Sequence, residues 1–401
     1  MESANVVWVL ISAALVMFMT PGLALFYGGL DSRKNMSNMM MMNMWALLTV
    51  PLLWGAIGYT LAQVPFDANF LGGLDNAFLS GLSVTGEDAG GTLSTFVFLA
   101  MFAVITPALI SGAVAGRMKF KAWAIFVPLW SLLVYVPVFK WIYGGWLGQR
   151  GSLDFAGGTA IHVNAGVAAL ACVLVLGKRK GFPQVETRPH SVPMVIVGAA
   201  ILWFGWFGFN AGSALAANGT AIQAFINTFL AGAAAGLAWV TVDMSSGKRV
   251  TNIGAASGIV AGLVAITPAA GFVAGFSSVW IGLIAGLGCN FAVRLKSKLG
   301  YDDALDVVGI HLIAGLIGSL LIGVFAEPEA FGGTFMTGLV HGGDASLLAE
   351  QALANAATIV YCFVMTTAIA LVLKSTIGLR VAESTEMDGL DIHEHDEISY
   401  S

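Results

Sequence analysis

The sequence predicts an all-α polytopic membrane protein with eleven transmembrane helices. Three observations predict this fold: an apolar composition, a series of long apolar segments, and basic residues that fall between alternate segments. Of the 401 residues, 57% are hydrophobic and only 10% are charged, and the mean hydropathy is +0.83. A soluble domain carries about 25% charged residues, so water is not the solvent for most of the surface.

The apolar segments give the expected helices in order. A helix needs roughly 20 apolar residues to cross the hydrocarbon core. Segments of about that length lie at residues 6–29, 36–63, 92–115, 122–145, 157–177, 192–211, 221–243, 253–273, 278–295, 306–326 and 352–374. No basic segment precedes the first one, so we expect a retained span and not a cleaved signal.

The basic residues test this count and orient the chain. Sixteen of the eighteen Lys and Arg residues follow odd-numbered segments, and only Lys140 and Arg150 fall on the other side. Cytoplasmic loops carry the excess of Lys and Arg. We therefore expect the N-terminus outside and the C-terminus inside the cell membrane.

The chain divides into a membrane domain, residues 1–380, and a cytoplasmic tail, residues 381–401. The tail holds seven acidic residues, two histidines and no Lys or Arg. Such a segment is either disordered or docked on the inner face. The cysteines lie inside apolar segments without metal-ligand spacing and are expected to be free thiols: Cys172, Cys289 and Cys362.

Two short motifs recur five segments apart. Residues 161–166 and 310–315 both have the pattern I-H-x-x-A-G, and residues 105–108 and 266–269 both read I-T-P-A. Because five is odd, a duplication of five spans inverts its second copy. The sequence thus predicts a 5+5 inverted repeat plus one extra helix, with the substrate site near the bilayer midplane where the two halves meet.

His162 and His311 are the only two of the six histidines that lie within the predicted spans. An ionisable side chain at that depth is costly and indicates a functional site. The alternatives are a pair of structural histidines, a metal site and a paired-imidazole proton relay. Zinc needs about three protein ligands, and no further ligand is evident at mid-span depth. We expect no metal and no cofactor, and we favour the relay.

Other polar and aromatic residues surround these spans. Asp154 precedes the fifth span and suits a bond to the free amides there, with an added attraction for a cation. Asp306, at the start of the tenth span, is expected to mirror Asp154. Aromatic rings in spans are usually packing residues or interface anchors, and a candidate set for the pore is Phe98, Phe102, Tyr143, Trp206 and Phe209.

The whole chain resembles the ammonium transporter family (Amt/Mep/Rh), and its Amt branch in particular. The block D-F-A-G-G-x-x-I-H at residues 154–162 carries this resemblance first. Further blocks agree with it, at residues 21–29, 205–213, 267–271, 306–311, 378–380 and 389–391.

The resemblance implies a homotrimer of eleven-helix protomers, each with its own pore for ammonium or ammonia. Phe102 and Phe209 resemble the stacked phenylalanine gate, and His162 and His311 the paired pore histidines. At the outer cation site, the implied residues are Phe98 and Ser213, with Asp154 below them. The tail resembles a regulatory terminus that works with a PII-type signal protein. We expect neither an enzyme nor a nucleic-acid partner.

One position departs from the family pattern. Tyr143 stands where the family usually has a tryptophan at the outer site, unless Trp141 or Trp146 takes that place. Tryptophan offers the better face to a cation, so a weaker outer site is one consequence. The departure keeps a second function open: an ammonium sensor of the same fold with little or no transport.

Overall fold

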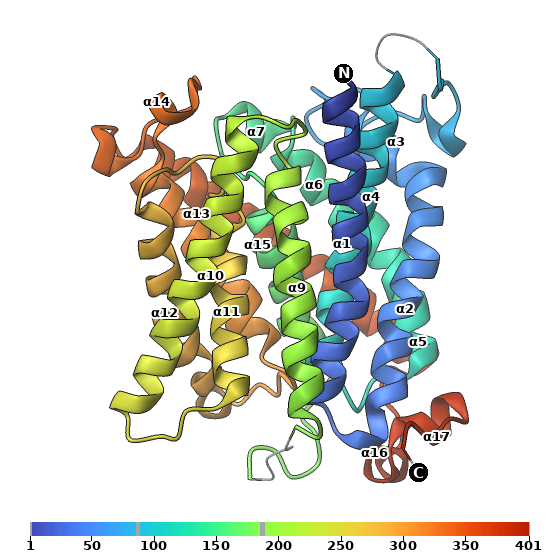
Figure 1. Cartoon of the computed structure of the whole chain (residues 1–401). Helices are drawn as coiled ribbons and strands as arrows, with labels where there is room; N and C mark the ends of the chain where they lie inside the picture. Colours follow the sequence, from blue (N-terminus) through green and yellow to red (C-terminus); the bar gives the residue numbers. More distant parts are fainter. Residues whose placement is uncertain (1, 86–88, 185–188, 401) are drawn as a thin grey trace.

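The computed structural model of the chain describes residues 2–85, 89–184 and 189–400. Within these ranges the fold is all helical, with no β-strand and a single isolated bridge between Met118 and Arg380. The helices form one bundle, with the N-terminus at one end and the C-terminus at the other (Figure 1). Arg188, one of the basic residues used to orient the chain, lies outside the described residues.

The elements follow one another along the chain with short connections. They are α1 (Ser3–Leu30), η1 (Arg33–Asn35), α2 (Met36–Leu53), η2 (Trp54–Gly58), α3 (Tyr59–Gln63), η3 (Ala77–Leu79), α4 (Ala89–Val114), α5 (Phe120–Trp130), η4 (Ser131–Tyr135), α6 (Val136–Ile142), α7 (Trp146–Gln149), η5 (Gly158–Val163), α8 (Asn164–Leu176), α9 (Val192–Gly212), α10 (Gly219–Ser245), α11 (Asn252–Ile266), α12 (Ser277–Leu299), η6 (Val308–Leu312), α13 (Ile313–Phe325), α14 (Pro328–Phe331), η7 (Leu339–His341), α15 (Ser346–Thr376), α16 (Glu383–Asp388) and α17 (Leu390–His395).

Ten helices in the described part of the chain are long and apolar enough to cross a membrane. The outward faces are apolar as well, with large hydrophobic side chains such as Leu52 and Phe291 well exposed. Contiguous apolar surface of this kind is typical of contact with lipid or with another subunit. The predicted segment 253–273 holds the shorter apolar helix α11, because the chain turns after Ile266 at Thr267 and Pro268.

The two spans that carry His162 and His311 are built alike. Each begins with a π-helix, η5 or η6, and continues as an α-helix of 13 residues, α8 or α13. A π-turn inside a helix is rare and is frequent at functional sites. Each histidine lies in the π-helical part of its span, where the wider turn alters the direction of the side chain.

The glycines of the two I-H-x-x-A-G motifs bring these spans together. A Cβ atom on Gly166 would lie 2.5 Å from the backbone nitrogen of Leu312, and one on Gly315 would lie 3.1 Å from the backbone nitrogen of Val163. Each glycine therefore packs on the residue that follows the histidine of the other motif. Small residues allow helices in lipid to approach this closely.

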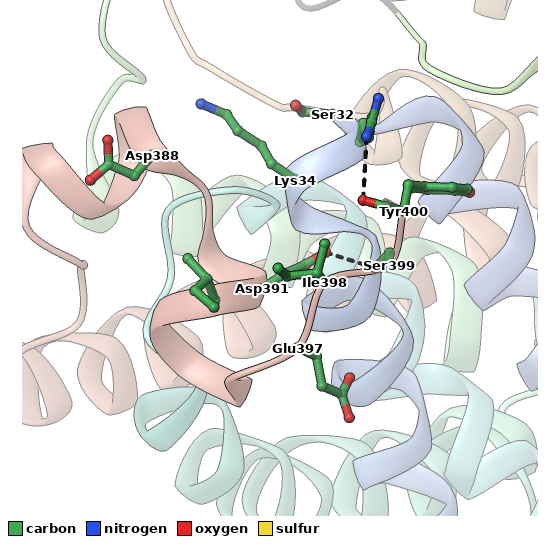
Figure 2. Close-up of a pocket in the computed structure, with 10 residues that line it drawn as sticks. Ser32, Lys34, Asp388, Asp391, Glu397, Ile398, Ser399 and Tyr400 are labelled. Atoms are coloured by element: carbon green, nitrogen blue, oxygen red, sulfur yellow. Dashed lines mark hydrogen bonds between the residues drawn. The ribbon is translucent and has the colours of Figure 1, made fainter.

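The tail docks on the end of the bundle where α1 ends and α2 begins. Asp391 accepts hydrogen bonds from the backbone amides of Ser37 (3.0 Å) and Asn38 (2.8 Å), and so caps the first turn of α2. Tyr400 bonds His190 through its hydroxyl, at 3.0 Å. A hollow of about 490 Å³ is lined by residues of the tail and of the segment Ser32–Lys34, and the Arg33 guanidinium donates to the carbonyl of Tyr400 at 3.3 Å (Figure 2). Of the two expectations for the tail, the structure has the docked form.

A buried ion-pair cluster joins three loops at the same end. Asp302 pairs with Arg179 at 2.6 Å and with the fully buried Arg117 at 3.7 Å. Burial alone would raise the pKa of Asp302, but the hydrogen bonds and charges of the two arginines hold it below its usual value. The backbone carbonyl of Arg117 accepts a bond from Val381, which fixes the start of the tail to this cluster.

Candidate functional site

The two mid-span histidines meet in the centre of the bundle. Nδ1 of His162 lies 3.2 Å from Nδ1 of His311, and the ring planes are inclined by only 17°. Both side chains are buried. Because one nitrogen must donate and the other accept at this distance, the pair can share one proton between its rings. His162 also stacks on Trp206, with ring centroids 5.4 Å apart.

Apolar side chains enclose the histidine pair in a narrow cavity. The lining residues are Met19, Leu23, Phe26, Ile105, Leu109, Leu202, Trp206, Phe209 and Val260 with the two histidines. The cavity has a volume of about 10 Å³, which is the space that a single water molecule needs. Among the described residues, no protein group lies within hydrogen-bonding distance of Nε2 of His162, so that nitrogen is free to bind a small polar molecule.

A stacked pair of rings lies between this narrow cavity and a wider one. The rings of Phe102 and Phe209 are 4.3 Å apart and inclined by 21°. Phe209 lines the histidine cavity, and Phe102 lines a cavity of about 280 Å³ that we call the Tyr143 cavity. Phe98 extends the aromatic wall, 4.7 Å from Phe102. The stacked pair therefore lies where the lining of one cavity meets the lining of the other.

The Tyr143 cavity gathers the remaining residues expected at the cation site. It is lined by Phe98, Phe102, Tyr143, Asp154 and Ser213 together with Gln63, Phe66, Thr95, Leu99, Phe139, Phe155, Ala156, Leu215 and Phe272. Trp141 and Trp146 do not line it, because the indole of Trp141 donates to the carbonyl of Phe70 and Trp146 packs on the ring of Phe70. Of the aromatic residues between positions 139 and 146, Phe139 and Tyr143 line the cavity.

Asp154 holds the π-helix that carries His162. Its carboxylate accepts hydrogen bonds from four consecutive backbone amides, Gly157 to Ala160, at 2.7–3.0 Å. These amides have no partner within the helix, and a carboxylate at a helix N-terminus satisfies them. Asp154 therefore has a structural task, and it also lines the Tyr143 cavity.

Asp306 does not mirror Asp154, and this expectation was wrong. Asp306 forms an ion pair with Lys296 at 2.6 Å and lines a polar cavity of about 370 Å³, which we call the Asp306 cavity. The residue that accepts a bond from the first turn of η6 is Asp303, at 2.7 Å from the amide of Val308. Asp303 lies eight residues before His311, as Asp154 lies eight before His162. That equal spacing was the signal that would have found it.

Two further residues belong to the site. The Tyr27 hydroxyl donates to the carbonyl of Leu109 at 3.1 Å and lies 3.5 Å from Nε2 of His311. Thr267 accepts a hydrogen bond from the indole of Trp206 at 2.8 Å and so fixes the ring that stacks on His162. Both lie in sequence blocks that carry the family resemblance, but a lone hydroxyl in an apolar segment gave no separate signal.

The site offers no arrangement for a metal. In the ranges that the structure describes, no three His, Cys, Asp or Glu side chains are grouped so that they could hold an ion.

Fold and site together define a class of protein: a multi-pass helical membrane protein with a narrow apolar cavity around two buried histidines and a wider cavity beside it. A family model for the Ammonium Transporter Family matches residues 7–400. The chain belongs to the ammonium transporter family, which by its name is a family of transporters and not of enzymes.

Individual relatives agree over the full length. The ammonium transporter of Aquifex aeolicus is 48% identical over 406 residues, which cover 100% of this chain and 94% of that protein. The crystal structure of Candida albicans Mep2 is 33% identical, with a TM-score of 0.89 over 96% of this chain and 87% of the other. A solved structure described as a sensor Amt protein is 28% identical, with a TM-score of 0.90 over 98% of both chains.

Proposed function

We propose that the chain transports ammonium across the cell membrane through the passage that joins the Tyr143 cavity to the Asp306 cavity. The observation that carries the proposal is the arrangement of the central site. Two buried imidazoles share a contact of 3.2 Å at the bottom of an apolar cavity that a stacked phenylalanine pair closes. Membership of the family supports ammonium as the substrate.

Ammonium is recruited in the Tyr143 cavity, where the hydroxyl of Ser213 and the aromatic faces of Phe98 and Tyr143 replace part of its water. Taking an uncompensated charge into an apolar passage is prohibitive, and such a group neutralises instead. The ion therefore gives up its proton near Phe102 and Phe209. Neutral ammonia then passes along the histidine cavity, and the proton is taken either by water in the Tyr143 cavity or by the imidazole pair, along which it can follow. Potassium has no proton to lose and is excluded.

The proposal includes the arrangement of the chain in the membrane. Helix α11 completes eleven crossings, spans 1–5 and 6–10 form an inverted repeat, and the Tyr143 cavity faces outward. Residues 1–380 are the membrane domain, and 381–401 are the cytoplasmic tail. Support comes from the matching construction of the two histidine spans and from the position of sixteen of the eighteen basic residues. The resemblance adds a homotrimer and a PII-type regulator at the inner face.

The test is charge movement and uptake in vesicles reconstituted with the purified protein. Wild type should give a current or an uptake signal on a jump of ammonium and none on a jump of potassium. His162→Ala should abolish that signal or admit potassium. His341→Ala is the matched control, because His341 lies in an exterior loop helix, η7, beside Glu327. Unchanged ammonium flux with potassium still excluded in His162→Ala would refute the twin-histidine mechanism.

A second candidate function is an ammonium sensor. The likeness to the sensor Amt structure and the tyrosine at position 143 favour it. A sensor would bind ammonium in the Tyr143 cavity, with saturable heat in titration calorimetry, while the same vesicles show neither current nor uptake. That pair of results decides between the two functions.

A further inference from the structure

The loop at residues 65–70 contributes Phe66 to the lining of the Tyr143 cavity. Five of its six carbonyl groups accept hydrogen bonds from the segment 140–149. The Lys140 ammonium bonds the carbonyls of Pro65 and Phe66, and the other three bonds come from Gln149 to Asp67, Trp146 to Asn69 and Trp141 to Phe70. One short segment, which also carries Tyr143, thereby fixes the whole loop.

Lys140 is the unusual member of this set. Its side chain is fully buried, and no carboxylate in the described part of the chain lies within ion-pair distance of it. A buried ammonium is costly unless hydrogen bonds compensate it. Its Nζ atom finds them at 2.6 Å and 2.8 Å from the carbonyl oxygens of Pro65 and Phe66, and it lies 5.7 Å from the centroid of the Phe66 ring.

Phe66 is thereby set against the cation site. Its ring lies beside Gly144, where a Cβ atom would come within 2.9 Å of two ring atoms. Gly144 has a left-handed backbone, with φ of 83°, and follows Tyr143 directly. Although Phe66 is 59% exposed, it lines the same cavity as Tyr143, Phe98 and Ser213. A large apolar ring held in an open position by a buried charge points to a task at the cavity.

We propose that Phe66 is a specificity-determining wall of the outer ammonium site and that Lys140 is the positioning residue that holds it there. The inference rests on the proposed function, because it assigns the cation to the Tyr143 cavity. Phe66 presents an aromatic face to a small cation next to Tyr143, which offers a weaker face than a tryptophan would. The Lys140 ammonium directs its donors at the carbonyl oxygens of Pro65 and Phe66.

The first experiment compares Phe66→Ala with Phe70→Ala in reconstituted vesicles. Phe66→Ala should raise the KM for ammonium-evoked current about 2–5-fold, the loss expected for one cation–π face, with kcat within about twofold. Phe70 is the matched control, since it is equally exposed in the same loop but packs on Trp146 and does not line the cavity. An unchanged KM in Phe66→Ala, or an equal rise in both variants, would overturn the proposal.

The second experiment is a double-mutant cycle with Lys140→Met, which keeps an unbranched side chain but removes the charge and the donors. If Lys140 acts through Phe66, the substitution should raise the KM in wild type and add nothing in Phe66→Ala. A KM that falls in both backgrounds would mean that Lys140 only repels the substrate cation, which contradicts a positioning role. If Lys140→Met does not fold, the Phe66 and Phe70 pair still decides.

Failure of the proposed function has a separate signature. Wild-type vesicles without current or uptake would count against transport itself. The dissociation constant for ammonium chloride is then measured by titration calorimetry on the same five proteins. It takes the place of the KM, with the same expected ratios between variants. If wild type is active and the Phe66→Ala substitution leaves the KM unchanged, this inference is rejected while the proposed transport function stands.

Discussion

At the scale of single residues, the two capping aspartates differ in how well they are satisfied. Asp154 accepts four amide bonds, whereas one carboxylate oxygen of Asp303 has no partner among the described residues. Burial raises the pKa of Asp303 to about 6, and the charge of Lys296 lowers it only in part. At neutral pH, Asp303 is therefore a carboxylate that its surroundings stabilise less well than water would.

This difference predicts a pH-dependent stability. A carboxyl whose pKa is raised on folding contributes stability below its unfolded pKa of about 4, and that stability is lost as the pH rises through about 6. Asp303→Asn keeps the acceptor for Val308 and carries no charge. Relative to Asp303→Asn, the free energy of unfolding of wild type should fall by up to ~3 kcal/mol between pH 4 and pH 8. The Tm of wild type minus that of Asp303→Asn should therefore decrease as the pH rises.

Thermal unfolding in detergent at pH 4, 6 and 8 measures this difference. Asp75→Asn is the control, because Asp75 is exposed and lies in a loop far from Asp303 in the sequence. A Tm difference between wild type and Asp303→Asn that does not change with pH would contradict the assignment.

At the scale of the elements, the approach of the two histidine spans depends on two glycines. The imidazoles meet because Gly166 and Gly315 let each span lie directly on the backbone of the other. The neighbours at Gly166 are backbone atoms of Leu312, which cannot rotate away as a side chain can. The motif I-H-x-x-A-G therefore combines a chemical group with the packing residue that positions it.

Gly166→Ala should push these spans apart. Overpacking against backbone costs roughly 1–3 kcal/mol, and a shift of a few tenths of an ångström breaks the contact of 3.2 Å between the imidazoles. We expect a lower Tm and at least a tenfold loss of ammonium flux in vesicles. Gly219→Ala, at the start of α10 with open space around it, is the control and should leave both unchanged. Normal flux in Gly166→Ala would show that this close approach is not required.

At the scale of the whole molecule, the tail ties the loops of one end together. Asp391 caps α2 from more than 350 positions away in the sequence, and Val381 bonds the loop of the buried Arg117. Glu383 and Glu386 pair with basic residues of neighbouring segments, Lys180 and Arg380. The acidic composition of the tail is thus matched to the basic loops that it covers.

Removal of the Asp391 carboxylate should release the tail. Loss of a helix cap costs about 0.5–2 kcal/mol. Because the cap comes from the tail, this loss weakens the binding of the tail to the bundle. In Asp391→Ala, a protease that cleaves after glutamate should cut the tail several-fold faster than in wild type, because Glu394 and Glu397 follow position 391. Asp388→Ala is the control, since the Asp388 side chain is 63% exposed and, within the described part of the chain, its one ion pair is with His393 at 3.4 Å. Equal cleavage rates in both variants would contradict the capping role.

Much of the fold could be predicted from the sequence, because the membrane leaves few choices. In lipid, a chain of this composition satisfies its backbone hydrogen bonds by forming helices. A long apolar segment therefore predicted a helix at nearly every span. The short helix α11 was beyond this reasoning, since an apolar run does not reveal where a chain turns at Thr267 and Pro268. The family membership, predicted from sequence blocks, is confirmed.

The sequence by itself determined the membrane class, the family and the identity of two histidines at matching positions. It could do so because hydropathy and motif spacing are properties of the chain. Only the tertiary structure decided which aspartate caps the second histidine span, that Tyr143 and not Trp141 or Trp146 lines the Tyr143 cavity, and that Lys140 binds a distant loop. Those outcomes depend on side-chain direction and on contacts between segments far apart in sequence, and neither is encoded in local pattern.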